Sequence, residues 1–320
     1  MFHQVHVLAH PAAGLWYTAN PAALAAMVDE CLSAGASLPA GAGPPVALVG
    51  PHAGFSYCGT VLGSTYKHLP ADCKRVVIMG PSHHVYLRRP VLSQADVMET
   101  PLGRVAVDRA SVDELFASGQ FDWFDPDADE AEHSIEMHLP FLQRAAVAAG
   151  MASAPSVVPI VIGGATGKHH RDIARAIAPL LRTPGTVLAV STDFCHWGRR
   201  FEFTHGLEDR TKAVHESIRS LDMAGMSALS SLRPDAFAEY MAKTGNTICG
   251  RHPLSVMLQA VAAEALPSGG ALHWLAYDQS GKALGKDDSS VSYAAGVLTG
   301  PAPAAAAAAG RGTEPTAASP

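Results

Sequence analysis

The sequence predicts an α/β fold: a single layered domain in which helices flank a central, largely parallel sheet. Short runs of Val, Ile and Leu bounded by Gly and Pro recur along the chain, and such runs are typical of fully buried strands. Segments of helical composition separate them, and strands that alternate with helices predict a parallel sheet. With 320 residues, 48% of them hydrophobic, the chain is long enough to bury a substantial core.

The first half of the chain carries the clearest alternation. A helix expected over 22–34 precedes a strand that ends at His52, a helix over 59–69 and a strand that ends at His83. A strand, a helix and a strand joined by short connections are the βαβ pattern of a parallel sheet. The remaining expected helices cover 111–118, 131–148, 167–182 and roughly 205–244, and the remaining expected strands cover 156–164, 186–192, 272–280 and 291–300.

Composition excludes several classes of protein. The net charge of −6 and the scattered Lys and Arg residues argue against a nucleic-acid partner. No run of 18 apolar residues occurs, so no membrane span is expected. Five cysteines are sparse and odd in number, which favours a reducing compartment, and the N-terminus lacks the pattern of a signal peptide. We therefore expect a cytoplasmic protein with one domain over 1–300 and a disordered Ala/Pro-rich tail over 301–320.

Polar side chains follow three of the apolar runs directly. His52 ends the first run, His83 the second, and Asp193 and His196 follow the third, at 186–192. Ligands of open α/β sheets bind outside the carboxyl ends of the strands. The three runs therefore predict a metal or acid–base site at one edge of the sheet.

Two interpretations of the strand-end histidines are open at this point. His52 and His83 either bond to backbone at the strand ends or bind a metal, and their equivalent positions after Gly-Pro turns favour metal binding. His84 must point in another direction and is a candidate to support a ligand through a hydrogen bond. Cys249 is either a core thiol or a ligand, and Gly250, which would allow a close backbone approach, favours the second.

The segment 130–140 is dense in ionisable groups. Asp129 followed by Glu132 fits an N-cap and its carboxylate partner, so a helix is expected to begin there. On such a helix His133 and Glu136 share a face, where they either bind a metal or form an exposed hydrogen bond. Pro140 either kinks this helix or begins a new one.

Three further residues are candidates for the chemistry itself. Asp193 and His196 are suited to proton transfer, and the Tyr57 hydroxyl could donate to a bound substrate, although a buried tyrosine is the commoner case. The chain lacks a dinucleotide-binding Gly motif between strand and helix, a phosphate-binding loop, His-Glu-x-x-His and Gly-x-Ser-x-Gly. Nucleotide-binding proteins, zincins and serine hydrolases are therefore disfavoured.

Six motifs of the chain are distinctive as a set, namely PHAGFSYCG, GPSHH, EHSIEMHLPF, STDFCHWG, NTICGRHP and DSSVSYAAG. Together they resemble the Memo family in its eukaryotic form, and the resemblance runs from about residue 8 to 299. The resemblance implies kinship with the bacterial AmmeMemoRadiSam system protein B and a fold like that of the LigB-type class III extradiol dioxygenases. It also implies metal-dependent redox activity and, in animals, a role in receptor tyrosine kinase signalling and cell motility.

The resemblance also assigns roles to residues. It implies that His52, His83 and Cys249 hold the metal, with Tyr57, Asp193 and His196 beside it. The related dioxygenases use a carboxylate where Cys249 stands here, and this difference disfavours ring cleavage. A thiolate is a soft ligand, so copper or iron is expected, as one ion, with zinc a weaker candidate.

Three functions are carried forward. The first is a metal-binding redox protein whose open coordination position binds O2 or a small molecule. The second is an Fe(II) dioxygenase of a catechol-like substrate, with Asp193 or Glu136 in place of Cys249. The third is an adaptor without catalysis that binds a phosphotyrosine peptide through imidazoles and an arginine such as Arg251.

Overall fold

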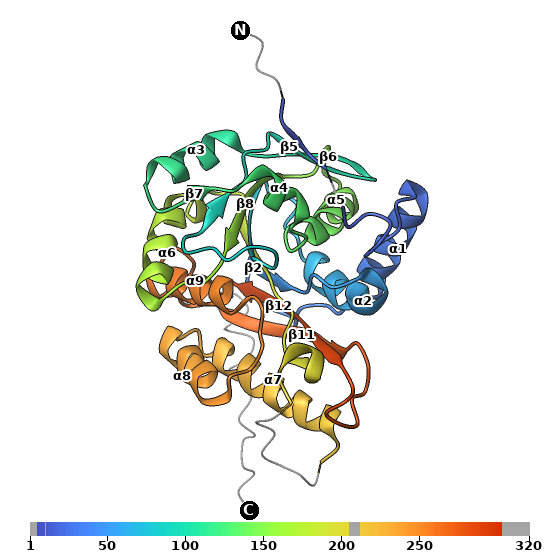
Figure 1. The fold of residues 1–320 in the computed structure, drawn as a ribbon. Helices are drawn as coiled ribbons and strands as arrows, with labels where there is room; N and C mark the ends of the chain where they lie inside the picture. Colours follow the sequence, from blue (N-terminus) through green and yellow to red (C-terminus); the bar gives the residue numbers. More distant parts are fainter. Residues whose placement is uncertain (1–4, 10, 205–211, 303–320) are drawn as a thin grey trace, which may run out of the picture.

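The computed structural model describes residues 5–9, 11–204 and 212–302. It confirms the predicted α/β class, because a large central sheet is covered by helices on both faces (Figure 1). A small sheet of β1 (Val7–Leu8), β5 (Val97–Thr100) and β6 (Gly103–Ala106) lies beside it.

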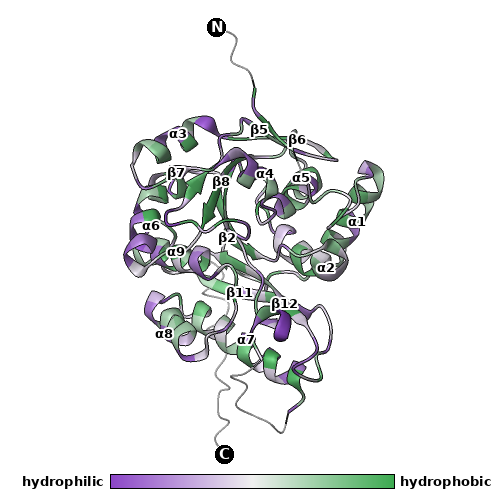
Figure 2. Ribbon diagram, in the orientation of Figure 1, coloured by the Kyte–Doolittle hydropathy of each residue, from purple (hydrophilic) through white to green (hydrophobic). Residues whose placement is uncertain are grey.

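The centre of the large sheet is parallel, as predicted. The strands β2 (Pro45–Gly50), β9 (Thr186–Ser191), β3 (Arg75–Pro81) and β8 (Ser156–Ile162) lie side by side in this order. Their interior residues are mostly β-branched or aliphatic and are buried, and Figure 2 shows β2 and β8 as strongly hydrophobic. The burial of this apolar surface holds the sheet together.

The outer strands are mostly antiparallel to the centre. On one side, β12 (Ser290–Thr299) pairs with β2. Both β11 (Ala271–Gln279) and β10 (His196–Trp197) pair with β12. At the opposite edge, β4 (Val91–Leu92) pairs with β8 and with β7 (Asp122–Trp123). The two late strands of the sequence thus pair as a hairpin along one side of β2.

Helices form a layer on each face of the sheet. One layer contains α1 (Pro21–Ala34), α2 (Phe55–Tyr66) and α5 (Leu139–Ala148), which pack against one another. The other contains α3 (Arg109–Ala117), α6 (Gly167–Leu181) and α9 (Arg251–Ala262). The helices α7 (Val214–Ser230) and α8 (Pro234–Thr244) pack on each other, against β11 and α9 respectively. Within the described residues no helix has the length and apolarity to cross a membrane.

The prediction of one continuous helix over 205–244 is wrong. Residues 205–211 lie outside the described part, and the rest divides into α7 and α8. Leu232 between them has φ of +56°, in the left-handed region, and Pro234 then begins α8. A left-handed residue followed by proline ends a helix, because neither continues the i to i−4 hydrogen bonds.

The prediction that a helix begins at Asp129 is also wrong. The helix here, α4 (Pro126–Ala131), begins after Asp125, whose side chain accepts the Ala128 N–H at 3.1 Å. Glu132 leaves the helix with an extended backbone, and a short 3₁₀ turn, η1 (Glu136–His138), follows. Pro140 begins α5 in the first turn, which is the second of its two predicted roles. Consequently His133 and Glu136 do not share a helix face.

The predicted tail over 301–320 can be followed only to residue 302, and its remainder lies outside the described residues. Its disorder, and the domain boundary at 300, stay predictions.

Candidate metal centre

Three neighbouring strands deliver their carboxyl ends to one edge of the sheet. Because β2, β9 and β3 are adjacent and parallel, His52, Asp193 and His83 follow them at the same edge. The rings of His52 and His83 lie 5.1 Å apart between centroids, edge to face. The convergence that the strand-end pattern predicts is therefore present in the fold.

The orientation of His52 is fixed by two hydrogen bonds. Its ring is almost fully buried, 2% exposed, and Nδ1 lies 2.6 Å from the Ser191 hydroxyl. That hydroxyl donates its only proton to the carbonyl of Ser134 at 2.6 Å. Nδ1 must therefore donate to Ser191, which leaves the lone pair on Nε2. Burial, together with the neighbouring imidazoles, holds the pKa of His52 well below its usual range, so the ring is neutral at pH 7.

Glu132 orients His83 in the same way. One carboxylate oxygen accepts the His83 Nδ1–H at 2.9 Å, and the other accepts its backbone N–H at 2.6 Å. Burial alone would raise the pKa of Glu132, but the hydrogen bonds from His83 and the Ser134 backbone lower it to about 2. The carboxylate is thus ionised and keeps the Nε2 lone pair of His83 free for a ligand bond.

Cys249 reaches the same place from the loop before α9. Its Sγ lies 3.4 Å from His52 Nε2 and accepts the Asp193 N–H at 3.1 Å. The close approach requires Gly250, since a Cβ there would lie 2.3 Å from the Cβ of Thr192. Burial, and then the nearby Asp193 carboxyl, raise the pKa of the Cys249 thiol, so an ion that binds it must displace a proton.

Asp193 links these groups. Its Oδ1 accepts the His52 backbone N–H at 3.0 Å, and Oδ2 lies 4.0 Å from His52 Nε2. Burial raises the pKa of this carboxyl to about 7, and the hydrogen bond from His52 opposes the rise. A carboxyl with this pKa exists in both protonation states at neutral pH.

His196 lies at the edge of the cluster. Its Nδ1 is 3.0 Å from the carbonyl of Phe194 and 3.1 Å from that of Thr247, so this nitrogen carries the proton and Nε2 the lone pair. Burial lowers its pKa, and its charge would repel a charge on His52 or His83. Its tautomer therefore suits proton acceptance.

Tyr57 differs from the other candidates. It lies in the first turn of α2 and its side chain is 60% exposed. It is thus not the buried tyrosine of the commoner interpretation, and a role toward a substrate stays a prediction.

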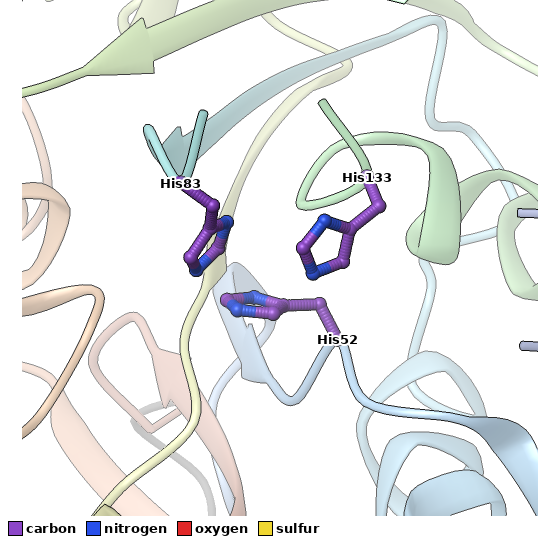
Figure 3. A group of neighbouring side chains, drawn as sticks. All are labelled: His52, His83 and His133. Carbon is purple, nitrogen blue, oxygen red and sulfur yellow. The ribbon is translucent and has the colours of Figure 1, made fainter. Parts of the chain in front are cut away.

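His133 joins the cluster although the expected helix does not exist. Figure 3 shows the rings of His83 and His133 directed at His52, and one nitrogen from each lies within 4.8 Å of the others. A second group, with the same limit, consists of His52, Asp193 and Cys249. Within the described residues neither group includes Glu136, which accepts the Tyr17 hydroxyl at 2.6 Å.

Sequence reasoning missed the residues that orient the ligands. Glu132 was interpreted as a helix cap, and Ser191 was not singled out, although it ends the third apolar run. The register of β2 and β9, which pairs Gly50 with Ser191, would have indicated that Ser191 lies near His52. No sequence signal pairs Glu132 with His83, because the two meet through separate loops.

The ligand atoms fit a transition metal. Neutral imidazoles and a thiol suit copper, iron or zinc, whereas Mg²⁺ and Ca²⁺ prefer sites built from oxygen. The hydrogen bonds to Nδ1 of His52 and His83 are those that metal-bound histidines usually make.

Comparison with known proteins points to one family. The family described as "Memo-like protein" matches residues 9–297. "Protein MEMO1" of Danio rerio is 40% identical over 289 residues, covering 89% of this chain and 95% of that protein. "Protein MEMO1" of Homo sapiens is 38% identical over 294 residues, covering 90% and 95%. A crystal structure of an uncharacterized protein from Escherichia coli K12 covers 78% of this chain and 99% of its own at 16% identity, with a TM-score of 0.43.

Proposed function

The chain belongs to the Memo family, and on that premise we propose that it is a metal-binding redox protein. In this proposal His52, His83 and Cys249 hold one copper or iron ion. The observation that carries it is the 3.4 Å approach of Cys249 Sγ to His52 Nε2, beside a second imidazole whose lone pair is free. A bound ion of either metal would supply one-electron exchange and an open position for O2 or a small molecule.

The surrounding residues support this chemistry through protons. Asp193, with a pKa of about 7, holds or releases a proton within 4.0 Å of His52 Nε2. His196, neutral and with its Nε2 lone pair free, can accept one. We propose that these two carry protons to and from a bound molecule, and that Tyr57 contacts it from the rim.

The cysteines support a reducing, cytoplasmic location. All five are free thiols, and four of them are buried. A free thiol that serves as a metal ligand is itself oxidisable, so a reducing compartment preserves the proposed site.

The proposal is tested by anaerobic titration with Cu(I) and, separately, Fe(II). Wild type is expected to bind one ion per chain, and His52→Ala, His83→Ala and Cys249→Ser are expected to weaken binding by a factor of about 10 or more. The matched control is Cys73→Ser, because the Cys73 thiol donates to the Arg75 carbonyl at 3.4 Å and lies in neither ligand group. Full retention of Cu(I) by Cys249→Ser would refute the ligand assignment.

An Fe(II) dioxygenase is the second candidate, and the place of Asp193 in one ligand group favours it. Asp193 would then complete a set of two histidines and a carboxylate. Oxygen consumption with a panel of catechols, in Fe(II)-loaded wild type and in Asp193→Asn, tests it. Turnover that Asp193→Asn abolishes and Cys249→Ser retains would favour this candidate over the first.

A further inference from the structure

His133 and Cys249 belong to different ligand groups, and both groups include His52. A nitrogen of His133 lies within 4.8 Å of nitrogens of His52 and His83, whereas Cys249 groups with His52 and Asp193. The His133 ring stacks on that of His83 at 4.6 Å between centroids and meets His52 edge to face at 5.6 Å. Since metal–nitrogen bonds are about 2.0–2.1 Å long, small ring rotations would bring all three nitrogens onto one ion.

The loop that carries His133 is held in place. The Ser134 hydroxyl donates to the Pro81 carbonyl at 2.8 Å, and Gly80 makes room for it, since a Cβ there would lie 2.5 Å from that hydroxyl. The Trp16 ring also packs on the His133 ring, with 4.4 Å between the two ring centroids. The ring is thus fixed between a strand end and an aromatic side chain.

The free nitrogen of His133 faces the cluster. Its Nδ1 lies 3.6 Å from a carboxylate oxygen of Glu132, and this acceptor favours the proton on that nitrogen. Figure 3 shows the other ring nitrogen directed at His52. Three imidazoles therefore offer lone pairs to one point.

The two ligand groups compete for His52. Its Nδ1 donates to Ser191, so it has one lone pair and can bind one ion at a time. Imidazoles suit divalent ions such as Cu(II), Zn(II) and Fe(II), and a thiolate suits Cu(I). The groups are thus alternatives that differ in the ion they prefer.

We propose that His133 is a metal ligand, and that His52, His83 and His133 form an all-imidazole site for a divalent ion, alternative to the thiolate site at Cys249. The proposal rests on the proposed function, in that this cluster binds metal. The His133 proposal adds one ligand and a second class of ion to the proposed function.

The test uses the full chain with Cys249→Ser, which removes the thiolate site. With Zn(II) this variant is expected to bind one ion per chain. Addition of His133→Ala is expected to raise the Kd for Zn(II) at least about 10-fold. Loss of a group that only supports a metal ligand already weakens binding by about this factor, and loss of a ligand itself should cost at least as much. Addition of His169→Ala is the control, because His169 is exposed on α6 and lies in neither group.

A count of imidazoles gives an independent readout. Pulsed electron paramagnetic resonance of Cu(II) bound to Cys249→Ser should detect three coupled imidazoles, and two after His133→Gln, which keeps a polar side chain if the alanine variant fails to fold. An unchanged Kd for Zn(II) together with an unchanged imidazole count overturns the proposal, as does failure of Cys249→Ser to bind Zn(II). Binding of Cu(I) by wild type tests the proposed function separately.

Discussion

The tautomer of each site histidine is decided by its hydrogen-bond partner. Ser191 takes the Nδ1–H of His52, Glu132 that of His83, and backbone carbonyls that of His196. Each partner leaves Nε2 with its lone pair. Since only an unprotonated nitrogen can bind a metal, these partners matter as much as the imidazoles themselves.

Glu132→Gln is expected to weaken Cu(I) binding about 10- to 100-fold. One carboxylate oxygen of Glu132 accepts from the His83 ring and from the Ser134 N–H, and the other accepts the His83 N–H. An amide must direct its NH₂ group at one of these donors, so it cannot satisfy all three. Anaerobic Cu(I) competition titration measures the change. Glu130→Gln, on the exposed face of α4, should bind as wild type does, and equal affinities of both variants would contradict this role.

At the scale of elements, a buried carboxylate on α7 ties the site loops together. Asp222 Oδ1 accepts the Asn246 side-chain N–H at 3.0 Å and the Cys195 backbone N–H at 3.2 Å. Oδ2 accepts the Tyr277 hydroxyl of β11 at 2.9 Å. One side chain thus joins the loop that leads to Cys249, the loop after β9, and the hairpin.

Asp222→Ala is expected to lower the free energy of unfolding by on the order of 3 kcal/mol, because it leaves buried donors without partners. It should also weaken Cu(I) binding, since the loop to Cys249 loses an anchor. Urea unfolding and Cu(I) titration measure the two effects. Ser220→Ala, exposed on the same helix, should change stability by less than about 0.5 kcal/mol. A destabilised variant with wild-type affinity would show that the carboxylate supports the fold but not the site.

At the scale of the whole molecule, the fold buries several histidines wholly or in part. Burial lowers the pKa of His133 to about 4 and that of His138 to about 3, and it also lowers the pKa of His170 and His252 to about 4. The ordinary value is 6.5, so below that pH the unfolded chain takes up protons that the folded chain refuses. The metal-free protein should therefore lose stability as the pH falls from about 6.5 toward 4.

His138→Gln isolates one of these groups. In wild type His138 is buried against Tyr66, whose hydroxyl lies 2.9 Å from Nδ1. Because burial lowers the pKa of His138 in the folded protein, its contribution to the free energy of unfolding is fully present above pH 6.5. This contribution declines by on the order of a few kcal/mol as the pH falls toward 3. The stability gap between wild type and variant should narrow between pH 7 and pH 4.5, as measured by urea unfolding of metal-free protein. A gap for His138→Gln that stays constant between pH 7 and pH 4.5 would contradict the buried neutral imidazole.

Local sequence determined the strands and the polar residues that follow them. Val, Ile and Leu runs bounded by Gly and Pro specify buried strands by themselves, and parallel strands bring their carboxyl ends to one edge, so His52, His83 and Asp193 could be placed together from the sequence. Gly250 likewise indicated the close approach that the Cys249 loop makes to Thr192.

Tertiary structure decided which atoms face the site. The 132–138 segment would continue a helix by its capping pattern, yet the Glu132 carboxylate bonds instead to His83, 49 positions away, and His133 turns into the cluster. The conformation of 132–138 depends on His83, which follows another strand, and a pattern of neighbouring residues carries no information about so distant a partner. The sequence by itself therefore determined the sheet and the edge that carries the site, while contacts between distant segments selected the tautomers, the added imidazole and the exposure of Tyr57.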